Sequence, residues 1–331
     1  MDELNVQALL GFGVTARRVV KARAGYTCYA DKGCFWVQKN FDTPSAIWFR
    51  HDVKEHAAAA GVPVADRFCL SVTGDPYVRL GGALYTMSVL CPYKDASFAD
   101  SGQLMGAVSV AAAFHKAARS ITFTEKVEMA DFNPEAPSPD LFLKNLQELH
   151  YMKKKVAAGK RLSDFDVLFI KHYDFYARQI ETAAALLAES GFTALNAQAV
   201  AERAVCHGAL KEENMPTDGE TVYLSNFSKA SPGHFLTDLA ALIIRYAKRL
   251  PGAAVPLRDI TARYAETFPL SIESRRALYP LLLYPDKFVR ICRQYYSKKR
   301  TWTPIALTSR MEAALAGREG YYGYILEAGK Y

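Results

Sequence analysis

The sequence predicts an α+β protein of two lobes, a small β-rich N-terminal lobe over residues 1–92 and a larger helical lobe over residues 93–331. Short runs of β-branched and aromatic residues, separated by turn residues, dominate the N-terminal part. Apolar residues at helical spacing dominate the rest. Within the helical part, the stretch from Cys206 to Ala240 has the pattern of a loop, a strand, a second loop and a helix.

The N-terminal lobe should begin with a short amphipathic helix from Met1 to about Gly13, with Leu9 and Leu10 on its buried side. Two strands are expected next, at 17–31 and 33–41, and the residues between them suit a hairpin turn.

Cys28 and Cys34 flank that turn and could meet across it if the chain were exposed to an oxidant. The six cysteines form no C-x-x-C pair, and most lie in apolar stretches. Buried free thiols are therefore expected in place of a zinc site.

Pro44 to Ala60 predicts a helix, and Gly61 with Pro63 should end it. Three further strands are expected after this break, and Cys91-Pro92-Tyr93 should mark the crossing into the helical lobe. The expected strands are 67–72, 76–80 and 83–90.

The second lobe should contain an Ala-rich helix, a Pro-rich loop at 132–140 and two long helices ahead of the central loop. More helices should follow that loop. Those before it are expected over about 100–120, 141–158 and 164–190.

Composition restricts the classes of partner. The chain has 331 residues, of which 50% are hydrophobic and 23% charged, as expected of a globular protein with a large core. Its net charge of +7 is dispersed, so we expect no nucleic-acid partner. No run approaches the roughly 20 apolar residues of a membrane helix, and the N-terminus lacks the pattern of a signal peptide. We therefore expect no membrane span and synthesis in a cytosol.

The central stretch resembles the core of the aminoglycoside and choline kinase-like proteins, which carry an H-G-D-x-x-x-x-N loop, a metal-binding Asp after a strand, and a helix that begins D-L-A. His207, Gly208 and Asn214 match the loop, and Asp238 begins a D-L-A. The resemblance implies a two-lobed protein-kinase-like fold, and it implies that Asp238 holds the loop in place.

Two positions depart from this pattern. Ala209 stands at the position of the catalytic Asp, and Asn226 at that of the metal-binding Asp. A methyl group cannot accept a proton or orient a hydroxyl. Mg²⁺ prefers anionic oxygens, so the amides of Asn214 and Asn226 would make a poor site. The departures predict a degenerate site with no metal and no cofactor.

The same resemblance implies a nucleotide-contacting lysine on the strand at 33–41. The strand pattern places Gln38 at that position, and a slip of one residue offers Lys39. Because side chains alternate between the faces of a strand, only one of the two can face a nucleotide, and we favour Gln38. Glu55 lies where kinases carry the partner of that lysine; it could equally be a solvated helix residue. We treat these three as a vestigial nucleotide site.

Nearby acids offer an alternative source of catalytic carboxylates. They are interpreted as solvated loop charges, and they are Glu212, Glu213 and Asp218.

A second pattern lies near the C-terminus and resembles the CotS family of spore coat proteins. Phe288, Ile291, Cys292 and Tyr295 also have helical spacing and should face a core. The matching residues are Tyr284, Pro285, Lys287, Phe288, Tyr295, Tyr296, Lys298, Lys299 and Trp302.

The CotS resemblance implies a structural component of the endospore coat, made in the mother-cell cytoplasm, whose partners are other coat proteins. The rival hypothesis is a working small-molecule phosphotransferase that uses ATP and Mg²⁺, with an acid-lined pocket for a cationic substrate. A third is a nucleotide-binding switch without turnover. The tail tyrosines, Tyr321, Tyr322, Tyr324 and Tyr331, should pack onto their own lobe, and a cross-linked tail is the alternative.

Overall fold

A computed structural model describes residues 3–22, 25–132, 136–159, 161–249, 255–297 and 302–326. The chain forms two compact units. The first comprises residues 1–134 and 199–235, and the second comprises residues 135–198 and 236–331. The expected division into lobes at residue 92 stays a prediction.

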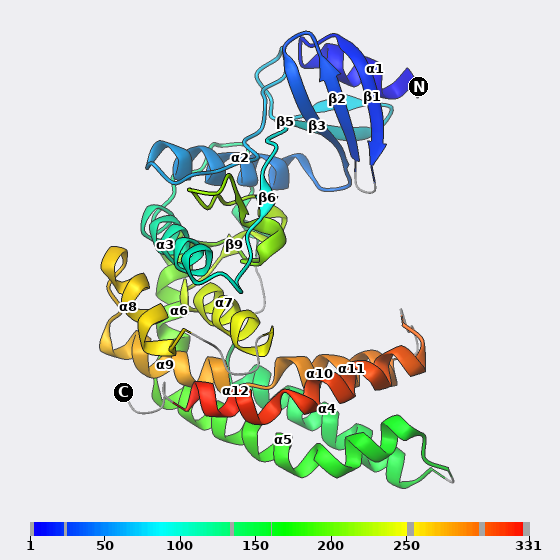
Figure 1. Ribbon diagram of the computed structural model, residues 1–331, viewed down its shortest axis with the longest axis vertical. Helices are drawn as coiled ribbons and strands as arrows, with labels where there is room; N and C mark the ends of the chain where they lie inside the picture. The colour runs from blue at the N-terminus through cyan, green and yellow to red at the C-terminus, as the bar shows by residue number, and fades with distance from the viewer. Residues whose placement is uncertain are drawn as a thin grey trace. The chain divides into compact units, whose positions relative to one another are not determined.

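The first unit contains a five-stranded antiparallel sheet with the strand order β1-β2-β3-β5-β4, drawn in blue and cyan in Figure 1. Helix α1 (Glu3–Gly11) packs on it and buries Leu9 against the sheet residues Cys28 and Val37. Leu10, expected beside Leu9, is exposed. The strands are β1 (Ala16–Ala22), β2 (Gly25–Ala30), β3 (Gly33–Asn40), β4 (Val78–Leu80) and β5 (Ala83–Val89).

The single strand expected over 17–31 is wrong, because this run forms two strands. β1 and β2 pair antiparallel, with Ala22 opposite Gly25. A Cβ atom on Gly25 would lie 2.6 Å from the carbonyl oxygen of Val37, so glycine permits the close approach of β2 to β3.

The segment 67–72 was expected to be a strand and is not one. Within it only Phe68 forms a bridge, to Ser88 of β5. Further along, the side chain of Ser71 accepts a hydrogen bond from the backbone of Asp75 and so organises a turn. Local side-chain bonds of this kind compete with strand pairing.

The register of the hairpin shows whether Cys28 and Cys34 can meet across the turn. Cys28 lies opposite Phe35, and Cys34 lies opposite Tyr29. Neighbouring residues of a strand point to opposite faces, so this register keeps the two sulfur atoms apart. All six cysteines are free thiols, and Cys28 is buried.

Helices α2 (Pro44–Ala59) and α3 (Ser101–Ala117) follow their predicted positions. Each begins at a side-chain cap, because Thr43 accepts the backbone N–H of Ala46 and Asp100 accepts that of Gln103. The first unit also contains short paired strands and single 3₁₀ turns: β6 (Lys94–Asp95), β7 (Val205–Cys206), β8 (Pro216–Thr217), β9 (Ser231–Pro232), η1 (Met129–Asp131), η2 (Glu212–Asn214) and η3 (Phe227–Lys229).

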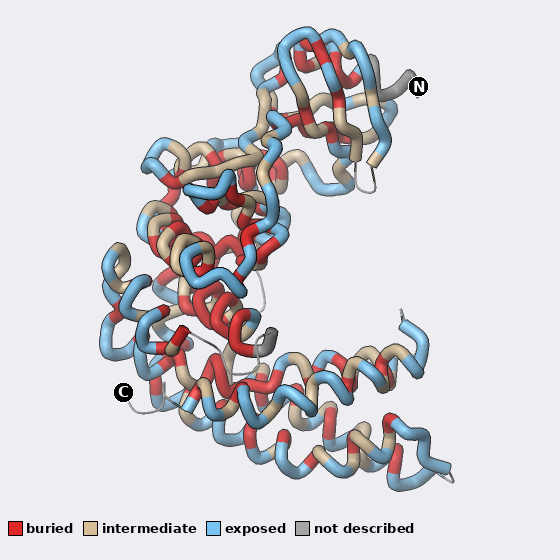
Figure 2. Tube along the Cα trace, in the orientation of Figure 1, coloured by how far each residue is buried: buried red, intermediate tan, exposed pale blue. Residues whose placement is uncertain are grey.

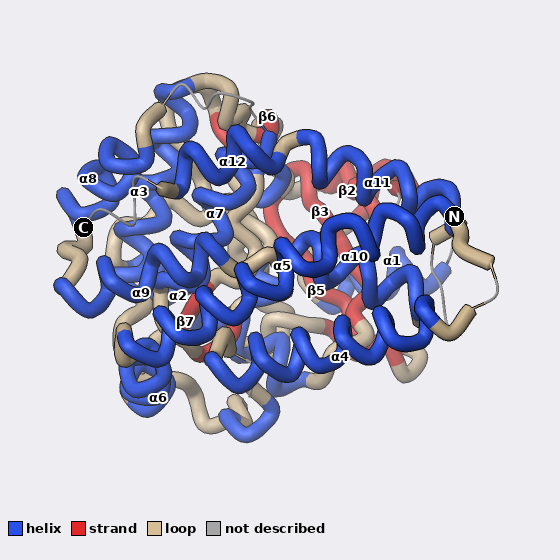
Figure 3. The backbone as a smooth tube through the Cα atoms, turned by 90° about the horizontal axis from the view of Figure 1, so that it is seen from below, coloured by secondary structure: helices blue, strands red, loops and turns tan. Residues whose placement is uncertain are grey.

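Long helices dominate the second unit, and the predicted pair at 141–158 and 164–190 is confirmed. Figures 1 and 3 show α4 and α5 side by side, and α10 beside α11. Helix α6 had not been predicted. The helices are α4 (Pro139–Ala157), α5 (Asp164–Glu189), α6 (Phe192–Ala201), α7 (Leu236–Arg249), α8 (Leu257–Thr267), α9 (Ile272–Leu283), α10 (Asp286–Tyr296), α11 (Pro304–Ala316) and α12 (Arg318–Ile325).

Aromatic side chains form much of the core of the second unit. The ring of Phe165 on α5 stacks on that of Tyr295 on α10, with their centroids 3.8 Å apart. Phe288, Ile291, Cys292 and Tyr295 are all buried, as their spacing predicted. In Figure 2, buried residues recur along one side of these long helices and cover most of α7.

Candidate functional site

The central loop is anchored in the first unit by a two-stranded pairing. Val205 lies opposite Pro232, and Cys206 opposite Ser231, which fixes where His207 leaves the strand. The strand expected within the stretch from Cys206 to Ala240, whose apolar run TVYLSNF covers 221–227, is wrong. Its residues make only isolated bridges, from Val222 to Thr217 and from Leu224 to Val64. The segment is extended, but its bridges go to two different segments of the chain, so it forms no regular strand.

His207 fastens the loop to this extended segment. Its side chain is fully buried, with Nε2 2.9 Å from the carbonyl oxygen of Ser225. Nδ1 accepts the backbone N–H of Ala209 at 3.3 Å. Together these contacts define a neutral ring whose Nε2–H donates to Ser225. The imidazole therefore serves to hold the backbone.

Gly208 is required by both conformation and space. Its φ of +73° lies in the left-handed region, and a Cβ atom there would lie 2.1 Å from the carbonyl oxygen of Lys229. Packing and backbone conformation therefore account for the glycine of the H-G pair.

The amide side chains of Asn214 and Asn226 bind each other. Asn214 is buried and donates from Nδ2 to the carbonyl oxygen of Ala209 at 2.9 Å. Its Oδ1 accepts the Nδ2–H of Asn226 at 3.0 Å. The oxygen that Asn214 could offer to a cation is therefore engaged by an N–H donor. Asn226 has a left-handed backbone, with φ of +57°.

An ion pair between buried Lys54 and partly exposed Asp66 supports Asn226, and the sequence did not predict it. Oδ2 of Asp66 accepts the backbone N–H of Asn226 at 2.8 Å and lies 3.0 Å from Nζ of Lys54. Lys54 is 2% exposed, and its ammonium lies 3.8 Å from the centroid of the Phe68 ring. Burial lowers the pKa of Lys54, and the charge of Asp66 opposes this shift. No local pattern pairs a helix lysine with an acid twelve residues later.

Of the three residues assigned to a vestigial nucleotide site, Glu55 binds another side chain and the other two are exposed on β3. The carboxylate of Glu55 accepts two hydrogen bonds from the guanidinium group of Arg67, and these bonds lower the pKa of Glu55. Gln38 and Lys39 are both exposed, and they lie opposite Thr86 and Tyr85 respectively. Their assignment to a nucleotide stays a prediction.

The acids of the loop differ from one another. Glu212 is buried and accepts the backbone N–H of Phe98 at 2.7 Å, so its interpretation as a solvated charge is wrong. Glu213 is exposed, as expected. Asp218 is exposed too, and backbone N–H groups, chiefly that of Thr221, lower its pKa.

Asp238 lies in the second unit, in the first turn of α7, and is 2% exposed. Among the described residues, no group of three or more His, Cys, Asp or Glu side chains has the geometry to hold a metal ion. His115, near the end of α3, is buried.

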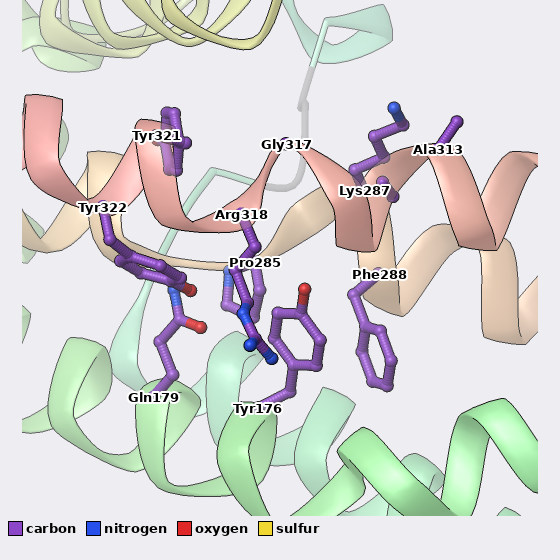
Figure 4. Close-up of a pocket in the computed structure, with 11 residues that line it drawn as sticks. Tyr176, Gln179, Pro285, Lys287, Phe288, Ala313, Gly317, Arg318, Tyr321 and Tyr322 are labelled. Carbon is purple, nitrogen blue, oxygen red and sulfur yellow. The ribbon is translucent and has the colours of Figure 1, made fainter. Parts of the chain in front are cut away.

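The tail tyrosines that the structure describes pack onto the second unit, as predicted. Tyr321 is buried and donates to the carbonyl oxygen of Leu282, and Tyr324 donates to that of Val255 at 3.1 Å. Figure 4 shows Tyr321 and Tyr322 around a small cavity of about 50 Å³, with Tyr322 beside Gln179. Tyr331, Lys298 and Lys299 lie outside the described residues.

None of the helices in the described ranges combines the length and the apolar character that a bilayer crossing requires.

The fold is that of the kinase-like aminoglycoside phosphotransferases. An aminoglycoside phosphotransferase from Alicyclobacillus acidocaldarius superposes with a TM-score of 0.85 at 18% identity, over 98% of this chain and 95% of that one. A spectinomycin phosphotransferase solved with ADP and spectinomycin gives 0.62 at 10% identity, over 94% and 96%. An ethanolamine kinase from Plasmodium vivax gives 0.54 at 12% identity, over 92% and 83%. The predicted fold class is confirmed.

The chain belongs to the family described as "Spore coat putative kinase YutH", whose model matches residues 11–327. This confirms the CotS-like resemblance and associates the chain with the spore coat. The search of curated proteins gave no match.

Proposed function

We propose that this protein is a folded, catalytically inactive kinase-like module of the endospore coat, made in the mother cell and docked to other coat proteins. Its family membership supports the location. The chemistry of Ala209, Asn214 and Asn226 supports the inactivity. The fold would serve as a stable scaffold for binding.

The observation that carries the proposal is the amide pair. Phosphoryl transfer depends on an oriented hydroxyl and on metal ions that neutralise the charge of the phosphates. Ala209 offers no group for the first task. For the second, Oδ1 of Asn214 already accepts an N–H from Asn226. A Mg²⁺ ion prefers anionic oxygens, and these two neutral amides, bound to each other, do not fit it.

The loop's remaining features fit a structural role. His207 bonds to two backbone groups, the carbonyl oxygen of Ser225 and the N–H of Ala209, and Gly208 fills a position that no larger residue could occupy. Asp66 holds the backbone of Asn226 with Lys54 as its counter-ion. These contacts would keep the loop ordered without a nucleotide.

The test compares phosphoryl transfer with coat incorporation. The purified chain is incubated with γ-labelled ATP, Mg²⁺ or Mn²⁺, and coat extracts from spores that lack it. We expect no labelled product. In sporulating cells, the variant Asn226→Gly removes the amide side chain and suits the left-handed backbone. We expect it to enter the coat as the unaltered chain does.

Labelled product from the unaltered chain would overturn the proposal in favour of the working phosphotransferase. Failure of Asn226→Gly to enter the coat, although the variant folds, would also contradict the proposal, because coat docking would then need the amide pair. The double variant Ala209→Asp, Asn226→Asp serves as the comparison for chemistry, because it supplies both carboxylates that the resemblance implies.

A further inference from the structure

A cavity of about 610 Å³ opens within the second unit, in the size range of small-molecule sites. It lies among α4, α7, α9 and α10. The charged side chains on its wall are four cations and one acid. They are Arg245, Lys287, Arg290, Arg293 and Asp286.

Two of the four cations are neutralised by acids, and two are not. Arg293 pairs with Glu148 at 2.7 Å, and Arg290 approaches Asp286 at 3.7 Å. Among the described residues, neither Arg245 nor Lys287 forms an ion pair. The cavity therefore has an excess of positive charge.

The surroundings of Lys287 strengthen this point. Burial lowers the pKa of Lys287, and the positive charges of Arg310 and Arg290 act in the same direction. In Figure 4, the amine of Lys287 points away from the guanidinium of Arg318. An anion near this ammonium would relieve the repulsion between the cations.

Other residues on the cavity wall are apolar or aromatic. The rings of Phe142 and Tyr284 stack with centroids 3.8 Å apart, and Leu281 and Ile244 also line the wall. Burial raises the pKa of Tyr284 to about 12, so its phenol stays neutral at ordinary pH. The wall thus combines a planar apolar surface with unpaired cations.

We propose that this cavity binds a small anionic molecule, with a phosphate or carboxylate group held by Arg245 and Lys287 and a compact apolar body against Phe142 and Tyr284. The inference is independent of the proposed inactivity of the central loop. It also runs opposite to the acid-lined pocket that a cationic substrate would require.

The test uses probes of matched shape on the full chain. Binding of phenyl phosphate, benzoate, benzamide and benzylamine is measured by titration calorimetry and ligand-observed NMR at low ionic strength. We expect the two anions to bind at least about tenfold more tightly than benzamide, and benzylamine not to bind. The preference should fall as salt is added.

The variant Arg245→Gln, Lys287→Met should weaken binding of both anions at least about tenfold. Its control is Arg258→Gln, Lys171→Met, which removes the same charges from exposed helix positions outside the cavity wall. Circular dichroism checks that both variants fold. If the first does not, the comparison of probes on the unaltered chain still decides.

Equal binding of benzoate and benzamide would overturn the proposal. So would equal losses in the two double variants, which would indicate a general effect of net charge. A preference for phenyl phosphate alone would identify the anion as a phosphate, and a preference shared with benzoate would identify a site for either group.

Discussion

At the scale of single residues, Lys54 and Asp66 show that polar groups around Asn226 are bound by other groups of the protein. The ammonium of Lys54 also donates to the backbone oxygen of Asp66 at 2.7 Å. A buried cation with one acidic partner is costly once that partner is removed. The pair therefore fixes the position of Asn226, and the stability of the fold depends on both residues of the pair.

The variant Asp66→Asn should lower the free energy of unfolding by about 3 kcal/mol or more, because it leaves the Lys54 charge buried without its counter-ion. Urea denaturation measures this loss. The control Asp75→Asn removes the acidic partner of Lys126, whose side chain is 51% exposed. That loss should stay below about 1 kcal/mol. Similar losses in both variants would contradict the structural role of the Lys54–Asp66 pair.

Because His234 is buried, we expect the free energy of unfolding to fall in acid. Burial, together with the charge of His115, lowers its pKa to about 4, from 6.5. Between these values the unfolded chain binds the proton and the folded chain does not. The free energy of unfolding should therefore fall by about 3 kcal/mol as the pH decreases from 7 to 4. Above pH 7 the contribution is constant.

Urea titrations across this pH range check the prediction. The variant His234→Gln should flatten the slope, and the control His150→Gln, at an exposed position, should not. His51, whose pKa burial also lowers, leaves a smaller slope of the same sign. An unchanged slope in His234→Gln would contradict the account.

At the scale of elements, the tyrosines of the spore coat pattern fix the start of a long helix. Ser163 and Asp166 form a capping box at the N-terminus of α5. Tyr295 lies within hydrogen-bond distance of Ser163, and Tyr296 donates to Asp166 at 2.7 Å. The sequence pattern on α10 is thus at least partly a packing pattern.

The variant Tyr296→Phe should destabilise the protein by about 1–2 kcal/mol, because it removes a hydrogen bond to a carboxylate. Ser163→Ala should cost about 1 kcal/mol as a lost cap. The double variant should cost less than the sum, since both act on Asp166. Additive losses, measured by chemical denaturation, would show that the cap and the tyrosine act separately.

Sequence patterns predicted the long helices and the strands at 33–41, 76–80 and 83–90, but they failed for 67–72 and 221–227. The period of apolar residues in α4 and α5 is a local property, so it survives without knowledge of the fold. The segment 67–72 forms one isolated bridge, to the distant Ser88, and 221–227 forms two, to Thr217 and to the distant Val64, so neither becomes a regular strand. The run 17–31 has strand-like residues throughout, and this hid the hairpin that divides it into β1 and β2.

The site shows the same limit. Motif spacing placed Ala209, Asn214 and Asn226 in one loop system, and hydrogen bonds join all three. Asp66 and its partner Lys54 could not be predicted, because the contact of Asp66 with Asn226 is made across 160 residues of chain. Glu212 was misjudged since an acid beside another acid in a loop gives no sign of burial.

At the scale of the whole molecule, a phosphotransferase fold is kept while its central loop lacks both implied carboxylates. The unit that holds the loop is ordered by backbone contacts of His207, by the tight packing of Gly208 and by the ion pair of Lys54 and Asp66. We expect a scaffold maintained in this way to need no bound nucleotide for its stability. Affinity for ATP therefore distinguishes an inactive scaffold from a working phosphotransferase.

The most direct measurement is a thermal-shift titration of the purified chain with ATP, with and without Mg²⁺ or Mn²⁺. A ligand that binds only the folded state stabilises it by about 2.7 kcal/mol at 100 times its dissociation constant, a shift of several degrees. We predict no shift under any of these conditions up to millimolar ATP. A metal-dependent rise would contradict the account, because it would mean that Asn214 and Asn226 hold a metal–nucleotide complex.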